Sequence, residues 1–344
     1  MTAVAAQRRT AGVLAAAYGL SGAGRPIGTE HLLSALTLRA GGPVAAALDR
    51  VDLTPTVAFA VLRDRADDWH SDDGGRHVGS AGPTPLAAGV PAGRHGQRPG
   101  TAAACRAFAV AASVAADTGS RVVSPGDVLH GLLADTTNRA TELLAWCAVD
   151  PARLANASGG AAPRERVARV GVELHATRDA LLGRRRCPAE SPADRLSGWL
   201  LHRMRVNLAR QPVYWLRRDA VDQARRSGFR HPRSEHLLLA LLATHEVATA
   251  YPELSARYAH RYDGGRRLAD AGLRYRDVLA VAHAHREQLG MDAAPVAAFL
   301  PAAGRGEPAG TGEVLRALLA TGGNRAVRLL DLLGPHRDTG QPAW

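Results

Sequence analysis

One segment of the chain occurs twice and predicts its fold. The first copy is Ile27-Gly-Thr-Glu-His-Leu-Leu-Ser-Ala-Leu36, and the second is Pro232-Arg-Ser-Glu-His-Leu-Leu-Leu-Ala-Leu241. In each copy a hydroxyl residue suited to capping precedes a glutamate, which favours the positive end of a helix. The alanines and leucines that follow are typical of a buried helix face. We therefore expect one helix to begin at Thr29 and another at Ser234.

Two weaker copies of the segment complete a repeating pattern. They are residues 125–133 (PGDVLHGLL) and 311–319 (TGEVLRALL), and each is followed by Asn-Arg-Ala, at 138–140 and 324–326. Recurrence of this kind is typical of proteins built from supersecondary units. Because strong and weak copies alternate, the chain is interpreted as a duplicated pair of half-repeats.

Each half-repeat is expected to consist of four helices. A helical period runs through residues 5–18 and 213–226, ahead of the two strong copies, and no alternating runs of β-branched residues are present. The sequence therefore predicts an all-α protein with two domains of similar build. The expected parts are a first domain at 1–157 with a flexible Gly/Pro-rich insertion at 70–99, a basic helical connector at 158–211, a second domain at 212–336 and a disordered tail at 337–344.

The composition excludes several classes of enzyme. The chain has 43 Lys and Arg residues, all of them arginine, and a formal net charge of +11. Without lysine it has no P-loop, no Schiff-base nucleophile and no lysine-dependent kinase site. Three widely spaced cysteines without a CxxC pair predict a reducing, cytoplasmic setting. No apolar run approaches about 18 residues, so we expect no membrane segment.

The positive charge is concentrated between Arg164 and Arg233, where 17 arginines accompany 7 acidic residues. Three interpretations are open: a solvated helix surface, a docking surface for an acidic partner protein, or a nucleic-acid site, for which the sequence has no motif. The docking interpretation rests on Arg184, Arg185, Arg186, Arg203 and Arg205. The same segment has an apolar stripe that we expect to pack inside the chain, formed by Leu196, Leu200, Met204 and Leu208.

The strong copies closely resemble the amino-terminal repeat domain of ClpC-type AAA+ unfoldases, a pair of four-helix half-repeats around a G-[ST]-E-H-[IL]-L-x-[AG]-L core. The resemblance covers most of the chain twice, and no ATPase motif accompanies it. It implies two receptor domains that perform no chemistry. It also implies binding of exposed peptide segments, adaptor proteins, phosphorylated arginine and Clp-directed cyclic peptides. The chain is then an adaptor, competitor or decoy for a Clp unfoldase, and an arginine-rich nucleic-acid-associated regulator is the alternative.

The resemblance directs attention to Glu30 beside Thr29 and to Glu235 beside Ser234. A carboxylate pairs with a guanidinium group, while helix N-terminal N–H groups or an arginine hold a phosphate. The weak copies carry glycine at the glutamate position, so we expect at most one such pocket in each domain. The other interpretation is that both glutamates only oppose the helix dipole.

Neighbouring histidines and aspartates are assigned structural or surface roles. We expect His31 and His236 to pack between helices and to hydrogen-bond a nearby loop. Asp72 and Asp73, at the start of the insertion, are expected to belong to a solvated acidic patch. No set of residues has the spacing of a metal site or a catalytic motif. The sequence therefore predicts neither an enzyme nor a cofactor.

Overall fold

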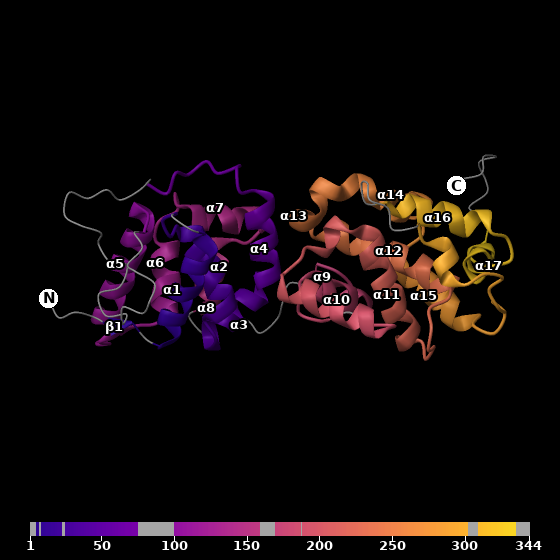
Figure 1. Ribbon diagram of the computed structural model, residues 1–344, viewed down its shortest axis with the longest axis horizontal. Coiled ribbons are helices and arrows are strands. Elements are labelled where there is room, and N and C mark those ends of the chain that lie inside the picture. Colours follow the sequence, from indigo (N-terminus) through magenta and orange to yellow (C-terminus); the bar gives the residue numbers. More distant parts are fainter. Residues whose placement is uncertain are drawn as a thin grey trace. The chain divides into compact units, whose positions relative to one another are not determined.

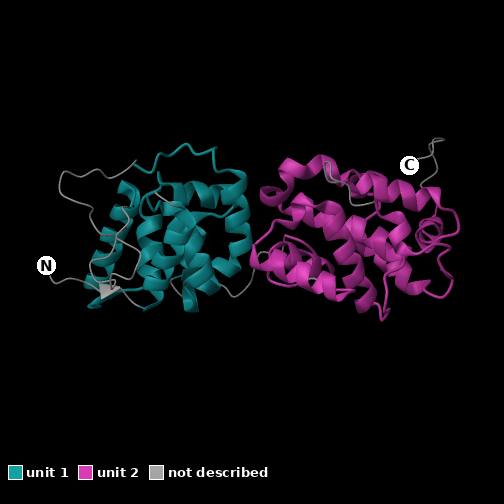
Figure 2. Ribbon diagram, in the orientation of Figure 1, with its two compact units in different colours: residues 1–167 teal, residues 168–344 magenta. Residues whose placement is uncertain are grey.

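The computed structural model describes residues 5–6, 8–22, 25–74, 100–158, 169–186, 188–301 and 309–334. The chain divides into two compact units, unit 1 at residues 1–167 and unit 2 at residues 168–344 (Figure 2). Both are mostly helical, as expected. Most of the expected insertion, residues 75–99, and the whole expected tail at 337–344 lie outside the described residues.

Unit 1 consists of two successive sets of four helices (Figure 1). The first set is α1 (Arg8–Ser21), α2 (Thr29–Arg39), α3 (Gly42–Arg50) and α4 (Pro55–Asp64). The second set is α5 (Ala102–Asp117), α6 (Pro125–Leu133), α7 (Arg139–Trp146) and α8 (Pro151–Ser158). Helix α1 packs along α2 and α5 along α6, while α2 also contacts α7. The leucines of the first strong copy are buried in α2, as their spacing predicts.

A short parallel strand pair joins the two sets. β1 (Ala5–Ala6) pairs with β2 (Val122–Val123), and an isolated bridge links Ile27 to Gly100. The Thr10 hydroxyl adds a 2.8 Å hydrogen bond to the Val123 carbonyl. The sequence analysis did not predict these strands, because a two-residue segment shows no alternation that could reveal it.

Unit 2 is built around α12 (Ser234–Ala250), in which every residue from Ser234 to Thr244 is buried. Helices α11 (Pro212–Arg226), α14 (Asp263–Asp270), α15 (Tyr275–Ala284), α16 (Thr311–Ala320) and α17 (Arg325–Leu332) pack against it. The remaining segments are η1 (Val172–Leu174), α9 (His175–Leu181), α10 (Pro192–Arg203), η2 (Leu208–Arg210), α13 (Pro252–Ser255), η3 (Ala256–Tyr262) and η4 (Val296–Phe299). No described helix of the chain has the length and apolar character needed to cross a membrane.

The last half-repeat differs from the expected set of four helices. Its described residues form α16 and α17, the counterparts of α6 and α7. Ahead of them, where α5 has its counterpart, the described residues 285–301 contain only the 3-10 turn η4. Pro295 directly before this turn and Pro301 after it both disfavour continuing a helix. The buried Phe299 of the turn lies beside α16 instead.

The described residues 169–186 and 188–211 of the expected basic connector pack within unit 2. Helix α9 lies against α12, and Thr177 in α9 donates a 2.6 Å hydrogen bond to Asp219 in α11. Arg185 forms a two-pronged ion pair with Asp222, at 2.9 and 2.6 Å. The described residues 169–211 are therefore part of a compact unit, whereas the sequence analysis assigned 158–211 to a separate connector.

Two glycines give a test of how tightly the helices pack. A Cβ at Gly131 in α6 lies 2.1 Å from the Ala107 carbonyl oxygen of α5, whereas a Cβ at Gly12 in α1 has no neighbour within 4 Å. We expect Gly131→Ala to destabilise the protein by about 2 kcal/mol through overpacking. Gly12→Ala should stabilise it by up to about 1 kcal/mol, because alanine loses less chain entropy on folding. Urea unfolding followed by circular dichroism measures the change in the free energy of unfolding for each variant. If both variants change stability in the same direction, the packing described for these two glycines is wrong.

Candidate functional site

The helices of the strong copies begin at Thr29 and Ser234, as expected, but neither hydroxyl residue is the N-cap. The N-caps are Gly28 for α2 and Arg233 for α12. In each helix the histidine of the first turn reaches back to the cap: the Gly28 N–H donates to His31 Nδ1 at 3.1 Å, and the Arg233 N–H donates to His236 Nδ1 at 3.0 Å. Burial lowers the pKa of His31 to about 4 and of His236 to about 3, so both rings are neutral acceptors at pH 7. The histidines therefore have the structural role expected of them.

A buried aspartate in unit 1 accepts hydrogen bonds from the first residues of two helices. Asp73 accepts hydrogen bonds from the Thr29 N–H at 2.9 Å, the Thr29 hydroxyl at 2.7 Å, the Thr101 hydroxyl at 2.5 Å and the Arg139 N–H at 3.2 Å. The Thr29 oxygen in turn accepts the Ala140 N–H at 3.0 Å. The carboxylate thus neutralises the positive ends of α2 and α7 together. The expectation that Asp73 lies in a solvated patch was wrong, because it is 1% exposed.

Unit 2 repeats this arrangement with Asp292. Its carboxylate accepts the Ser234 N–H at 2.9 Å, the Ser234 hydroxyl at 2.5 Å and the Arg325 N–H at 2.8 Å, and the Ser234 oxygen accepts the Ala326 N–H at 3.0 Å. Ser234, like Thr29, is fully buried. Both hydroxyls proposed from the sequence as ligand contacts are therefore engaged in joining helices, and Ser234 does not line the pocket described next.

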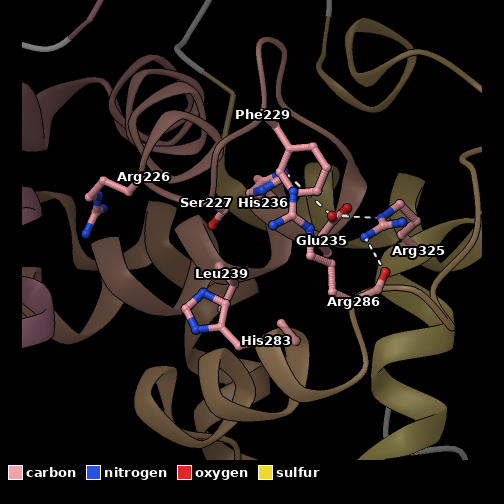
Figure 3. A pocket seen from close by; sticks show the side chains of 10 residues that line it. Arg226, Ser227, Phe229, Glu235, His236, Leu239, His283, Arg286 and Arg325 are labelled. Carbon is pink, nitrogen blue, oxygen red and sulfur yellow. Dashed lines mark hydrogen bonds and ion pairs between the residues drawn. The ribbon is translucent and has the colours of Figure 1, made fainter.

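Glu235 borders a pocket of about 350 Å³ in unit 2, here named the Glu235 pocket. Its lining comes from the end of α11, the following loop, α12, the end of α15 with its loop, and the start of α17. Figure 3 shows Glu235, Arg286 and Arg325 gathered on one side of it near Phe229, with Arg226 apart from them. The lining residues are Arg226, Ser227, Phe229, Glu235, His236, Leu239, Ala282, His283, Arg286 and Arg325.

The carboxylate of Glu235 is only partly satisfied within the protein. Oε1 lies 2.7 Å from Arg325 Nε, and Oε2 is buried with no hydrogen-bond partner among the described residues. Burial raises the pKa of Glu235 above its usual range, and the positive charge of Arg325 opposes that rise. A buried acceptor without a donor is unfavourable. A ligand that brings an N–H group to Oε2 therefore improves the hydrogen bonding of this site.

Three arginines surround the ring of Phe229. The guanidinium carbons of Arg286, Arg233 and Arg325 lie 4.2, 4.3 and 5.9 Å from its centroid, and the His236 ring meets its edge at 5.2 Å. A cation over the face of an aromatic ring is attracted by the charge distribution of the ring. Arg325 is buried, while Arg286 is exposed and can face a ligand. The pocket thus combines arginine charge suited to an anion with one acceptor suited to a cation.

Glu30 is the counterpart of Glu235 in unit 1. Its Oε1 lies 3.5 Å from Arg139, which occupies the same place in α7 as Arg325 in α17, and its Oε2 is also buried with no hydrogen-bond partner in the part of the chain that the structure describes. Burial, followed by the charge of Asp73, raises the pKa of Glu30 to about 7. The carboxylate lies against Gly28, where a Cβ would come within 2.1 Å of Oε2. Arg139 rests on Trp69, with 5.4 Å between guanidinium carbon and ring centroid.

The weak copies use the glutamate position for packing. A Cβ at Gly312 would lie 2.0 Å from the Asp263 carboxylate, which accepts the Gly312 N–H at 2.8 Å. In the other weak copy, Asp127 and Ser124 form a reciprocal cap at the start of α6, next to Gly126. Gly312 is therefore needed for close packing, while the expectation of at most one carboxylate pocket in each domain stays a prediction.

The structure divides the arginines that the sequence analysis assigned to a docking surface. Arg184 lies 3.7 Å from Asp179, and Arg185 is paired with Asp222. Arg186 and Arg203 are exposed, and Arg203 lies over the Trp199 ring at 5.7 Å. The pKa of His202 is lowered chiefly by burial, and the charges of Arg205 and Arg186 lower it further. Both arginines therefore lie beside α10. Internal ion pairs therefore occupy part of the basic segment that the nucleic-acid alternative relies on.

Comparison with known proteins does not assign the chain to a family. No family model matches it, and no curated protein matches it either. Among the described residues, no group of three or more His, Cys, Asp or Glu side chains is arranged to hold a metal ion.

Sequence reasoning found Glu235 but missed most of the side chains around it. Phe229 and Arg286 lie in loops, and neither belongs to a repeated motif. Arg325 was visible as the middle residue of Asn-Arg-Ala, which repeats at 138–140. That repeat was the one available signal, because it places an arginine at the start of α7 and of α17.

Proposed function

We propose that this protein is a non-enzymatic receptor that binds a phosphorylated guanidinium group, presented on a peptide, in the Glu235 pocket. The observation that carries the proposal is Glu235, which lines a pocket together with Arg286 and Arg325 and whose buried Oε2 has no hydrogen-bond partner among the described residues. A phosphorylated arginine offers N–H donors to a carboxylate and phosphate oxygens to guanidinium groups.

The role of the whole chain follows from the resemblance of its strong copies to ClpC-type amino-terminal domains. A chain that binds such ligands but carries no P-loop motif sequesters them or hands them on. We therefore propose that it acts as an adaptor, competitor or decoy for a Clp unfoldase and its ligands, Clp-directed cyclic peptides included. A ClpC-type protease degrading an arginine-phosphorylated substrate should slow when excess chain is added. Unchanged degradation contradicts the competitor and decoy roles.

Binding to the Glu235 pocket can be measured with phosphoarginine itself. In calorimetry with the full chain we expect phosphoarginine to bind, and arginine and inorganic phosphate each to bind at least about tenfold more weakly, because each satisfies only half of the pocket. Glu235→Gln and Arg286→Gln should each weaken phosphoarginine binding about tenfold or more.

Arg276→Gln is a matched control for these variants. Arg276 is an exposed arginine of α15 that does not line the pocket, so its loss should leave binding unchanged. Equal binding of phosphoarginine and inorganic phosphate would show an unspecific anion site. Equal losses in the Arg276 and Arg286 variants would show that only the overall charge matters. Either result contradicts the proposed ligand.

A further inference from the structure

The outer face of α10 carries several of the exposed large apolar side chains described in unit 2, and it has no role in the proposed function. Leu196 is 66% exposed, and Trp199, Leu200 and Met204 are 43%, 45% and 48% exposed. They are spaced three and four residues apart, so they form one stripe along the helix. The expectation that this stripe packs inside the chain was wrong. Leu208, its fourth expected member, lies beyond the helix in η2.

Helix α10 is held to unit 2 by polar contacts on its opposite side. None of its residues is buried. Asp194 lies 3.2 Å from Arg217 and 3.6 Å from Arg218, both in α11. Gly198 allows this approach, since a Cβ there would come within 2.7 Å of Arg218. A helix of this length usually owes its stability to burying an apolar face. Here that face is turned to solvent, as an interaction surface would be.

The charges on this face are all positive. Arg203 follows Trp199 by four residues and Leu196 by seven, so it lies within the stripe, and its guanidinium rests on the Trp199 ring. Arg195 borders the stripe one turn before Trp199. The only acidic residue of α10, Asp194, points to α11. Tryptophan and arginine together are typical of the residues that dominate protein interfaces.

We propose that the outer face of α10 docks an acidic amphipathic helix of a partner protein. Apolar residues of the partner cover Leu196, Trp199, Leu200 and Met204, and a carboxylate between them pairs with Arg203. A second copy of this chain fits less well, because two α10 faces would oppose arginine to arginine. The proposal concerns a surface separate from the Glu235 pocket.

A designed peptide tests the proposal with the full chain. The probe is a fluorescein-labelled helix of about 18 residues, or about five turns, with a leucine stripe flanked by glutamate. A matched peptide has glutamine in place of glutamate. Fluorescence anisotropy should show that the glutamate peptide binds and that the glutamine peptide binds at least about tenfold more weakly. Trp199→Ala and Leu200→Gln should each weaken binding about tenfold or more.

Two further variants make the result specific. The Arg203→Glu variant should no longer bind the glutamate peptide. It should instead bind a peptide that has lysine at the glutamate positions. Met291→Gln is the control, because Met291 is an 82% exposed apolar residue outside α10. This variant should bind the glutamate peptide as tightly as the unaltered chain does. Circular dichroism should show unchanged helix content in all four, since each substituted side chain is solvent-facing.

Several outcomes would overturn the proposal. One is no binding of the glutamate peptide at about millimolar concentration, which is the weak end of measurable association. Another is equal binding of the glutamate and glutamine peptides. The third is that Leu200→Gln instead abolishes self-association in sedimentation, or binding to phosphatidylglycerol vesicles, while the peptide does not bind. That last result would assign the α10 face to a second copy or to a lipid surface.

Discussion

Replacing Asp73 with alanine is expected to lower the free energy of unfolding of unit 1 by about 4 kcal/mol. The substitution removes four hydrogen bonds to one buried carboxylate, each charge-assisted and worth about 1.5–3 kcal/mol before relaxation. It also leaves the Thr29 and Arg139 N–H groups without their acceptor at two helix N-termini. Urea unfolding followed by circular dichroism measures the loss. Hydrogen–deuterium exchange should place it in α2 and α7.

The neighbouring residue Asp72 provides the control. Asp72 is exposed, and its carboxylate accepts the local Gly74 N–H at 2.8 Å. Asp72→Ala should therefore change stability by no more than about 0.5 kcal/mol. Asp292→Ala, the equivalent change in unit 2, should cost about 2 kcal/mol, because Asp292 is half-buried and accepts fewer hydrogen bonds. If Asp72→Ala and Asp73→Ala have equal effects, the role given to Asp73 is wrong.

Glu30→Gln is expected to change how stability depends on pH. The pKa of Glu30 is raised from 4.5 to about 7 in the folded chain, chiefly by burial. Below pH 4.5 the carboxyl group is protonated in both folded and unfolded states, so its contribution to stability is complete. Between pH 4.5 and 7 the unfolded chain releases this proton while the folded chain keeps it. Stability is therefore lost as the pH rises, by about 3 kcal/mol in total.

The glutamine variant lacks this titration. The free energy of unfolding of the variant minus that of the unaltered chain should therefore increase as the pH rises from 4.5 to 7. Urea unfolding at a series of pH values gives the comparison, with the exposed Glu287→Gln as control. Parallel stability curves for the unaltered chain and Glu30→Gln would show that Glu30 ionises normally.

Local sequence was enough to place α2 and α12 and their buried leucines. The Glu-His-Leu-Leu pattern specifies a helix start and an apolar face within ten residues, so no distant contact was needed to find it. It was also enough to assign His31 and His236 a structural role. The cap itself was misplaced by one residue, because Thr29 and Ser234 resemble N-caps but donate to distant aspartates.

Asp73 shows where local reasoning failed. It stands in an Asp-Asp-Gly-Gly context that is typical of a solvated turn. Its burial depends on Thr29 and Arg139, which are 44 and 66 residues away in the sequence. The Glu235 pocket likewise depends on contacts between residues that are distant in the sequence, since Phe229, Arg286 and Arg325 come from three separate segments.

Periodicity alone determined that this chain is mostly helical, because the hydrogen bonds of a helix and the spacing of its apolar residues are local properties. Only the tertiary structure decided which carboxylates are buried, which arginines are paired with acids, and that the α10 stripe is turned to solvent. A stripe in a sequence indicates that one helix face is apolar, but burial depends on what other segments lie beside it. That choice is made by contacts between residues far apart in the chain.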